Sequence, residues 1–283
     1  IDEMIASLKA IEPIITRNIH LEPEKLWEVT SPHIQNNPFA HCALDIAMHD
    51  LNGKRKNSPL YKLWGLNLKN TPTTSYTIGI DTVERMVEKI NSFPWPLYKI
   101  KLGTKDDIKI ITELRKHTKS VFRIDANGAW DASEAIQNSF KLKNFNVEFI
   151  EQPLPIENTK GMLEVYQKSA LPVIADESCL NENDVSKCNH HFHGINIKLT
   201  KCRGITPAKR MISEAKMLGL KVMMGCMTES SVGISAIAQF LPLLDYVDMD
   251  GALLLKNDIA EGVKIYDGNV LFPERSGTGV RLL

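Results

Sequence analysis

Eight short runs rich in β-branched and other apolar residues alternate with helical stretches from residue 73 onward. The runs are SYTIGI (75–80), LYKIKL (97–102), VFRIDA (121–126), VEFIEQ (147–152), PVIADE (172–177), GINIKL (194–199), KVMMGC (221–226) and DYVDMD (245–250). No Pro-rich or Gly-rich linker interrupts the alternation. Eight strand-then-helix units predict an α/β fold with a closed parallel (β/α)₈ barrel of the TIM type rather than an open sheet.

The chain before the first run has a different texture and reads as helices. Residues 40–54 repeat apolar positions at the helical period, and Gly53 is expected near the C-cap of that helix. The chain starts within an amphipathic helical pattern, so we expect an N-terminally incomplete first part. We therefore predict a helical part at 1–70, the barrel at 71–262 and a C-terminal segment at 263–283 that returns to the helices as a hairpin.

The charge and the cysteine content limit the kinds of partner that the chain is expected to bind. The 283 residues carry 34 basic and 34 acidic side chains, so no net field draws the chain to nucleic acid or to an anionic membrane. The five cysteines are odd in number and form no metal-ligand spacing, which is typical of reduced thiols. We expect a soluble, cytoplasmic protein that acts on a small molecule, with a homo-oligomer left open.

Acidic residues close three consecutive runs, where a packed barrel core would not choose them. Asp125, Glu151 and Asp176 are 26 and 25 residues apart, which is one strand–helix repeat each. Because barrel strands all end at the same face, these carboxylates should converge there and repel one another unless a cation lies among them. Hard oxygen ligands on separate strands favour Mg²⁺. Taken singly, each acid could equally be an ordinary strand-end cap or salt-bridge partner.

Lysines end the runs on either side of these acids. Lys101 precedes the three carboxylates and Lys198 follows them, so one lysine is expected on each flank of the metal. A lysine beside Mg²⁺ and a second ammonium should have a lowered pKa, as an amine base needs. Lys99 shares the side-chain direction of Lys101 by strand alternation. Surface lysines at strand ends are the plainer alternative, but the apolar surroundings YKIKLG and INIKLT disfavour it.

Five ordered motifs resemble the enolase superfamily and, within it, the muconate-lactonising subgroup. They are KIK (99–101), DANGAW (125–130), EQP (151–153), ADES (175–178) and NIKLTKCRG (196–204). The segment AHCALDIAMHDLNGK (40–54) is similar to the helical stretch that precedes the barrel in that subgroup. The resemblance implies a (β/α)₈ barrel closed by an α+β capping domain, of which mostly helices are expected here. It also implies that Asn127 and Glu177 orient the metal ligands.

The last run narrows the resemblance to dipeptide epimerases. DMDG (248–251) resembles their pair of aspartates, which implies that Asp248 and Asp250 hold the N-terminal ammonium of a dipeptide. GCMTES (225–230) resembles a loop lining the same pocket, so Met227 and Thr228, together with Lys99 and Thr77, are expected to bind substrate. Two acids opposite a cation would suit a molecule with an amine at one end and a carboxylate at the other. Simple solvation of a strand end is the alternative for the two aspartates.

The expected reaction inverts the α-carbon of the C-terminal residue of the dipeptide. Removing a proton α to a carboxylate gives a dianionic enediolate, whose charge Mg²⁺ and Lys99 could take up. Lys101 and Lys198 would each serve as acid and base on opposite faces, an enolase-type use of lysine and Mg²⁺ that is already established. Alternatives are o-succinylbenzoate synthesis or muconate cycloisomerisation on the same scaffold, a catalytically silent metal-binding barrel, and a Schiff-base lysine enzyme.

Overall fold

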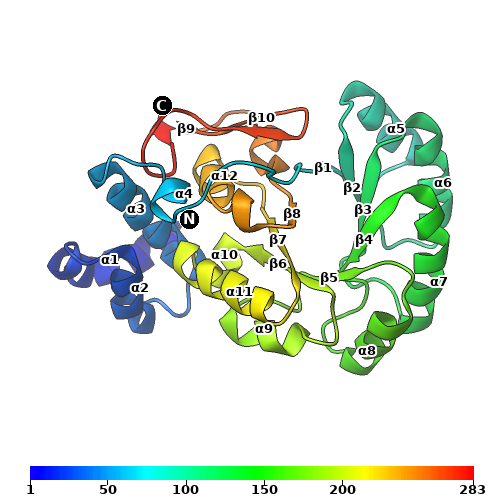
Figure 1. Ribbon diagram of the computed structural model, residues 1–283, viewed down its shortest axis with the longest axis horizontal. Coiled ribbons are helices and arrows are strands. Elements are labelled where there is room, and N and C mark those ends of the chain that lie inside the picture. The colour runs from blue at the N-terminus through cyan, green and yellow to red at the C-terminus, as the bar shows by residue number, and fades with distance from the viewer.

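A computed structural model describes residues 1–283 and contains an eight-stranded parallel sheet whose strands follow chain order (Figure 1). The strands are β1 (Tyr76–Ile78), β2 (Leu97–Lys101), β3 (Val121–Asp125), β4 (Val147–Glu151), β5 (Val173–Ala175), β6 (Gly194–Lys198), β7 (Lys221–Gly225) and β8 (Tyr246–Val247). A parallel bridge between Thr74 and Val247 brings the start of β1 beside β8. The sheet therefore curls round into the predicted barrel-type fold.

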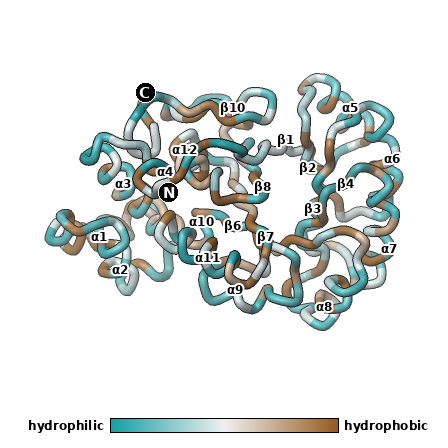
Figure 2. The backbone as a smooth tube through the Cα atoms, viewed as in Figure 1, coloured by the Kyte–Doolittle hydropathy of each residue, from teal (hydrophilic) through white to brown (hydrophobic).

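Helices follow the strands and cover the outside of the sheet. They are α5 (Val83–Ser92), α6 (Asp107–His117), α7 (Ala132–Leu142), α8 (Thr159–Lys168), α9 (Glu182–Cys188), α10 (Leu199–Cys202), α11 (Ile205–Met217) and α12 (Ser231–Ala238), with 3₁₀ turns η2 (Lys143–Phe145), η3 (Leu241–Leu243) and η4 (Asp250–Leu254). Hydrophobic strands and mixed outer helices are visible in Figure 2. Because α5 turns hydrophobic residues such as Met86 and Ile90 inward, one buried core runs between helices and sheet. No helix is both long and apolar enough to span a bilayer.

The N-terminal part is helical, as predicted. It comprises α1 (Asp2–Asn18), α2 (Pro23–Thr30), η1 (Ser31–His33), α3 (Pro38–Arg55) and α4 (Leu60–Leu63). The buried carboxylate of Asp45 on α3 accepts hydrogen bonds from the backbone N and Oγ1 of Thr206, both at 2.8 Å. These bonds fix α3 against the start of α11, close to the end of β6.

The C-terminal segment forms short antiparallel pairs and packs against the N-terminal helices. It contains β9 (Ala260–Glu261), β10 (Lys264–Tyr266), β11 (Asn269–Leu271) and β12 (Arg281–Leu282). β10 and β11 make a hairpin, and β12 pairs with β9. The backbone N of Leu60 donates to the carbonyl of Gly277, and Asp50 accepts from the backbone N of Thr278. The division of the chain at residues 70 and 262 stays a prediction.

The sequence position of Gly53 suggested that it caps the C-terminus of α3, but it does not. The helix continues to Arg55, and Gly53 lies inside its last turn. A Cβ built on Gly53 would lie 2.5 Å from the Cα of Gly277. The glycine is therefore needed for the close approach of the C-terminal segment, which no local pattern reveals.

Candidate active site

Three buried carboxylates lie together at the C-terminal end of the sheet. Asp125 ends β3 and pairs in register with Glu151, which ends β4. Asp176 is the first residue after β5, so this strand is shorter than predicted. Gln152 holds the start of that loop, because its Oε1 accepts from the backbone N of Asp176 at 3.1 Å. The in-register ladder, rather than loop structure, thus sets the first two carboxylates side by side.

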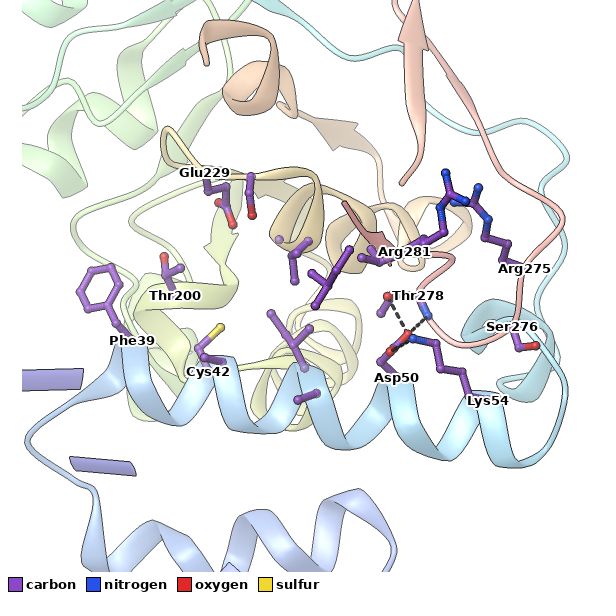
Figure 3. Close-up of a pocket in the computed structure, with 18 of the residues that line it drawn as sticks. Phe39, Cys42, Asp50, Lys54, Thr200, Glu229, Arg275, Ser276, Thr278 and Arg281 are labelled. Carbon is purple, nitrogen blue, oxygen red and sulfur yellow. Dashed lines mark hydrogen bonds and ion pairs between the residues drawn. The ribbon is translucent and has the colours of Figure 1, made fainter. Parts of the chain in front are cut away.

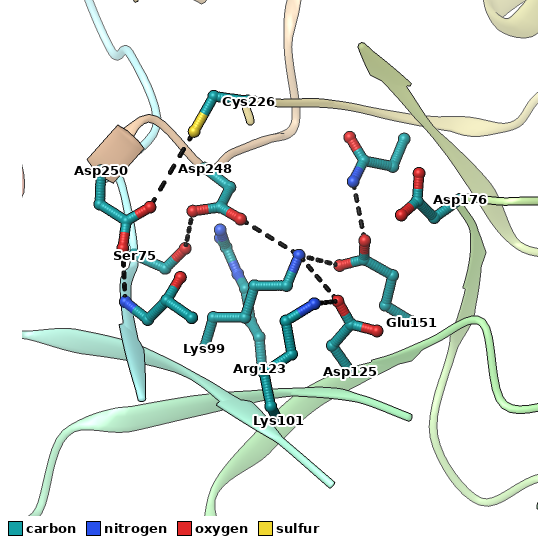
Figure 4. Close-up of polar contacts among 12 residues, drawn as sticks. Ser75, Lys99, Lys101, Arg123, Asp125, Glu151, Asp176, Cys226, Asp248 and Asp250 are labelled. Carbon is teal, nitrogen blue, oxygen red and sulfur yellow. Dashed lines mark hydrogen bonds and ion pairs between the residues drawn. The ribbon is translucent and has the colours of Figure 1, made fainter. Parts of the chain in front are cut away.

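The ammonium of Lys99 lies between two of these carboxylates, Asp125 and Glu151, and a third acid, Asp248 (Figure 4). Its Nζ is 3.0 Å from Oδ2 of Asp125, 2.9 Å from Oε2 of Glu151 and 3.1 Å from Oδ2 of Asp248. Burial lowers the pKa of Lys99, but Glu151 and Asp125 outweigh burial and raise the pKa well above its usual value. Lys99 is therefore a permanent cation.

The two predicted bases lie on opposite sides of the barrel. Lys101 comes from β2 and Lys198 from β6, four strands away in either direction round the eight-strand order. Nζ of Lys101 donates to Oδ2 of Asp125 at 2.6 Å, and Nζ of Lys198 donates to Oδ2 of Asp176 at 2.7 Å. Burial lowers the pKa of Lys198, but the Asp176 carboxylate outweighs it and raises the pKa; the lowered pKa expected for a lysine beside bound Mg²⁺ stays a prediction.

The three carboxylates supply oxygen ligands of the kind that a divalent cation prefers. Burial, and then repulsion by Asp125, raise the pKa of Glu151 to about 7, so the ammonium of Lys99 compensates the charge of this acid only in part. Its Oε2 accepts no well-aligned hydrogen bond and has only the ion pair with Lys99. For Asp125, Lys99 and Lys101 outweigh burial and hold the pKa at about 2. An all-carboxylate donor set with an under-compensated member is the chemistry that Mg²⁺ suits.

Asn127 and Glu177 lie beside the cluster and contact each other. The backbone N of Asn127 donates to Oδ1 of Asp125 at 3.1 Å, and its Oδ1 accepts from Lys101 at 2.9 Å. Its Nδ2 donates to Oε1 of Glu177 at 3.1 Å. Asn127 thus touches one of the three acids directly, whereas Glu177 reaches the cluster only through Asn127.

The predicted acid pair faces the cluster from the far side of the barrel. The sequence suggested that Asp248 and Asp250 lie within the last strand. In the structure β8 ends at Val247, so both aspartates lie just after it. Oδ1 of Asp248 accepts from the hydroxyl of Ser75 at 3.1 Å, and Oδ2 of Asp250 accepts from the backbone N of Thr77 at 2.7 Å. Burial, and then the charge of Asp248, raise the pKa of Asp250 to about 7.

A cavity of about 330 Å³ joins these groups. Its wall includes eleven of the predicted site residues: Thr77, Lys99, Lys101, Asn127, Asp176, Glu177, Lys198, Met227, Thr228, Asp248 and Asp250. Asp125 and Glu151 do not line the cavity. Each forms an ion pair with Lys99, which does line it.

Sequence reasoning missed several polar neighbours of the site. Lys201 pairs with Oδ1 of Asp176 at 2.8 Å, and Asn196 donates to Oε1 of Glu151 at 2.8 Å. Asn196 precedes Lys198 by two residues, so strand alternation could have placed it on the same face. No local signal pointed to Ser75.

A second, larger cavity of about 1070 Å³ lies between α3, α12 and the C-terminal segment (Figure 3). Its polar lining includes Asp50, which accepts from Thr278, and the arginines Arg275 and Arg281. Its Lys54–Asp50 ion pair, at 2.6 Å, is partly exposed, and its lining lacks a set of buried carboxylates flanked by two lysines. The candidate chemistry therefore belongs to the smaller cavity.

Comparison with known proteins identifies the family. The mandelate racemase / muconate lactonizing enzyme N-terminal domain matches residues 5–65, and the enolase C-terminal domain-like family matches residues 81–283. The L-Ala-D/L-amino acid epimerase of Flavobacterium johnsoniae is 56% identical over 280 residues, which is 99% of this chain and 83% of that protein. The enzyme of the same name from Maribacter sp. is 57% identical over 282 residues, with the same two shares.

A solved structure agrees with the sequence relatives. The dipeptide epimerase of Cytophaga hutchinsonii, complexed with Mg and the dipeptide D-Ala-L-Val, superimposes with a TM-score of 0.86 at 27% identity, over 93% of this chain and 75% of that one. The fold, the sequence relatives and both family matches thus agree, and the chain belongs to the enolase superfamily, with the domains of the mandelate racemase / muconate lactonizing enzyme family.

Proposed function

We propose that the chain is an isomerase, a Mg²⁺-dependent dipeptide epimerase that inverts the α-carbon of the C-terminal residue. One observation carries the proposal: the functional groups lie on two diameters of one barrel end. Lys101 and Lys198 come from β2 and β6, while Glu151 on β4 is opposite the acids that follow β8. A substrate that extends from Glu151 to the acids after β8 would present opposite faces of a central carbon to the two lysines.

The lysines would perform the proton transfers. Whichever of Lys101 and Lys198 is neutral removes the α-proton from its face, and the other delivers a proton to the opposite face, so the stereocentre inverts. The roles exchange with the direction of reaction. A single lysine could only return a proton to the face it came from.

The substrate carboxylate would be bound at the three-acid cluster. Asp125, Glu151 and Asp176 would hold Mg²⁺, which supplies positive charge for the carboxylate as negative charge builds on its oxygens. Lys99 adds a fixed cation to the same region, because its pKa is raised well above the usual value. Asn127, hydrogen-bonded to Asp125, would keep that carboxylate in place.

The acid pair supports a dipeptide over the other reactions known on this scaffold. Asp248 and Asp250 are buried and Lys99 balances the charge of Asp248 only in part, so a cation of the substrate would match what remains. The substrates of o-succinylbenzoate synthesis and muconate cycloisomerisation carry no ammonium. A silent metal-binding barrel or a Schiff-base enzyme would have no use for two opposed lysines and an acid pair.

Incubation of dipeptide libraries with the protein and Mg²⁺ in D₂O tests the proposal. Proton NMR should show loss of the α-proton signal of the C-terminal residue and growth of the diastereomer's signals. The α-proton of the N-terminal residue should persist. Exchange at neither position, or exchange without epimer, would refute the assignment.

A further inference from the structure

The candidate cavity has little apolar wall. Fifteen residues line it, and only three of these are hydrophobic: Cys226, Met227 and Leu254. A dipeptide brings two side chains into this space, and apolar side chains gain free energy only where they leave water. The three residues are therefore the available contacts for substrate side chains.

Cys226 is the member of this set that contacts the acid pair. Its Sγ lies 4.0 Å from Oδ1 of Asp250, and Sγ and one oxygen from each of Asp248 and Asp250 lie within 4.8 Å of one another. Figure 4 shows the thiol directed from the end of β7 toward Asp250. An ammonium bound by both carboxylates places its α-carbon only one N–C bond, about 1.5 Å, further on. A side chain on that carbon that points toward the end of β7 would pass close to Sγ.

The thiol is held in place from behind. A Cβ built on Gly251 would collide with the carbonyl O of Met227 and lie 3.1 Å from Sγ of Cys226, so the end of β7 and the start of η4 are in close contact. The backbone of Gly251 and Met227 therefore lies behind the thiol and limits its movement in that direction. Met227 and Leu254, by contrast, are 43% and 45% exposed and are free to adjust.

We propose that Cys226 limits the size of the side chain on the N-terminal residue of the substrate, so that only small residues fit beside it. The inference rests on the proposed dipeptide epimerase function and adds the residue that sets N-terminal selectivity. One extra methylene against a hydrophobic wall typically changes kcat/KM by about 10-fold to 200-fold. Substituting Cys226 should therefore change the ratio of kcat/KM values between dipeptides whose N-terminal residues differ in size.

The test compares glycyl, L-alanyl, L-2-aminobutyryl and L-valyl dipeptides that share one C-terminal residue. The parent protein should turn over the alanyl dipeptide at least about ten times better than the aminobutyryl one, which is one methylene larger. Cys226→Ala should shift that ratio toward the aminobutyryl dipeptide by about tenfold. Cys226→Leu should shift preference toward the glycyl dipeptide. Cys188→Ala, a buried cysteine outside this cavity, should keep the parent's ratios.

Each result decides. Parent ratios retained in an active Cys226→Ala protein overturn the inference, and so does an equal loss on all four dipeptides, which would make Cys226 structural. Cys226→Ala removes only one atom, so it serves alone if the leucine variant does not fold. A parent that epimerises no dipeptide at all refutes the proposed function itself, a result distinct from an unchanged ratio.

Discussion

Nζ of Lys99 lies 3.1 Å from Oδ2 of Asp248, while the same ammonium contacts Asp125 and Glu151 on the other side. One buried cation thus joins the three-acid cluster to the acid pair. The two poles are not independent, because the charge of Asp248 is already partly balanced by Lys99. Asp250, which has no lysine partner, is left with the greater need for a cation from the substrate.

Loss of one ligand charge should weaken metal binding. Glu151→Gln keeps the shape of the side chain but removes the charge, so calorimetry should show Mg²⁺ affinity reduced by about tenfold or more. Asp250→Asn is the matched control and should leave that affinity unchanged. A crystal structure with Mg²⁺ should show oxygens of Asp125, Glu151 and Asp176 within about 2.0–2.1 Å of the ion. A well-occupied site that lacks any of the three would contradict the ligand set.

Each lysine should be essential for epimerisation. Lys101→Ala and Lys198→Ala should each abolish inversion, while one variant retains α-proton exchange from a single enantiomer in D₂O, because one base remains on its face. Lys221→Ala, an exposed lysine at the start of β7, serves as the control and should stay active. Full epimerisation by either of the first two variants would rule out the two-base mechanism.

Neutralising Asp250 should weaken the binding of free dipeptides. Asp250→Asn removes one partner of a desolvated charge pair, which costs about 2–5 kcal/mol, so kcat/KM should fall tens-fold or more. N-acetyl dipeptides lack the ammonium and should be poor substrates for the parent. The variant should discriminate against them much less. Equal turnover of acetylated and free dipeptides by the parent would indicate an N-acylamino-acid substrate instead.

The pH dependence of kcat/KM should report the ionisation of Asp250. Burial and Asp248 raise the pKa of Asp250 to about 7, and only the ionised form attracts an ammonium. For free dipeptides, kcat/KM should therefore rise with pH through about 7 and fall again above about 8, where the substrate's own α-amino group loses its proton. Asp250→Asn should lose this step. A step of the same size in the variant would assign it to another group.

Gly53→Ala should destabilise the protein although it lies within a helix. Helix propensity alone favours alanine by about 1 kcal/mol, but the new methyl would press on the Cα of Gly277, and overpacking typically costs about 1–3 kcal/mol. Chemical denaturation should show a net loss. Gly79→Ala, where a built Cβ meets no atom within 4 Å, is the control. A more stable Gly53→Ala protein would mean that the two segments separate easily.

The strand pattern predicted where the charged side chains of the site lie better than it predicted their polar neighbours. The acids Asp125 and Glu151 and the lysines are placed by alternation and by the common direction of parallel strands, and both signals are local. The bond between Ser75 and Asp248 joins residues 173 positions apart, and it depends on how the sheet curls. The contact of Gly53 with Gly277 likewise arises only in the folded chain. Such pairings leave no periodic trace in the sequence.

Strand pairing also determines which changes the site can survive. Lys101 is opposite Asp125, and Asp125 is opposite Glu151, across hydrogen-bonded backbone. A one-residue deletion inside β4 would turn Glu151 out of the barrel, because strand phase has a period of two. An insertion in the loop before a strand leaves that phase intact. Reaction type is therefore locked by backbone phase, whereas the rim that selects substrates can be rebuilt by insertions and deletions without disturbing it.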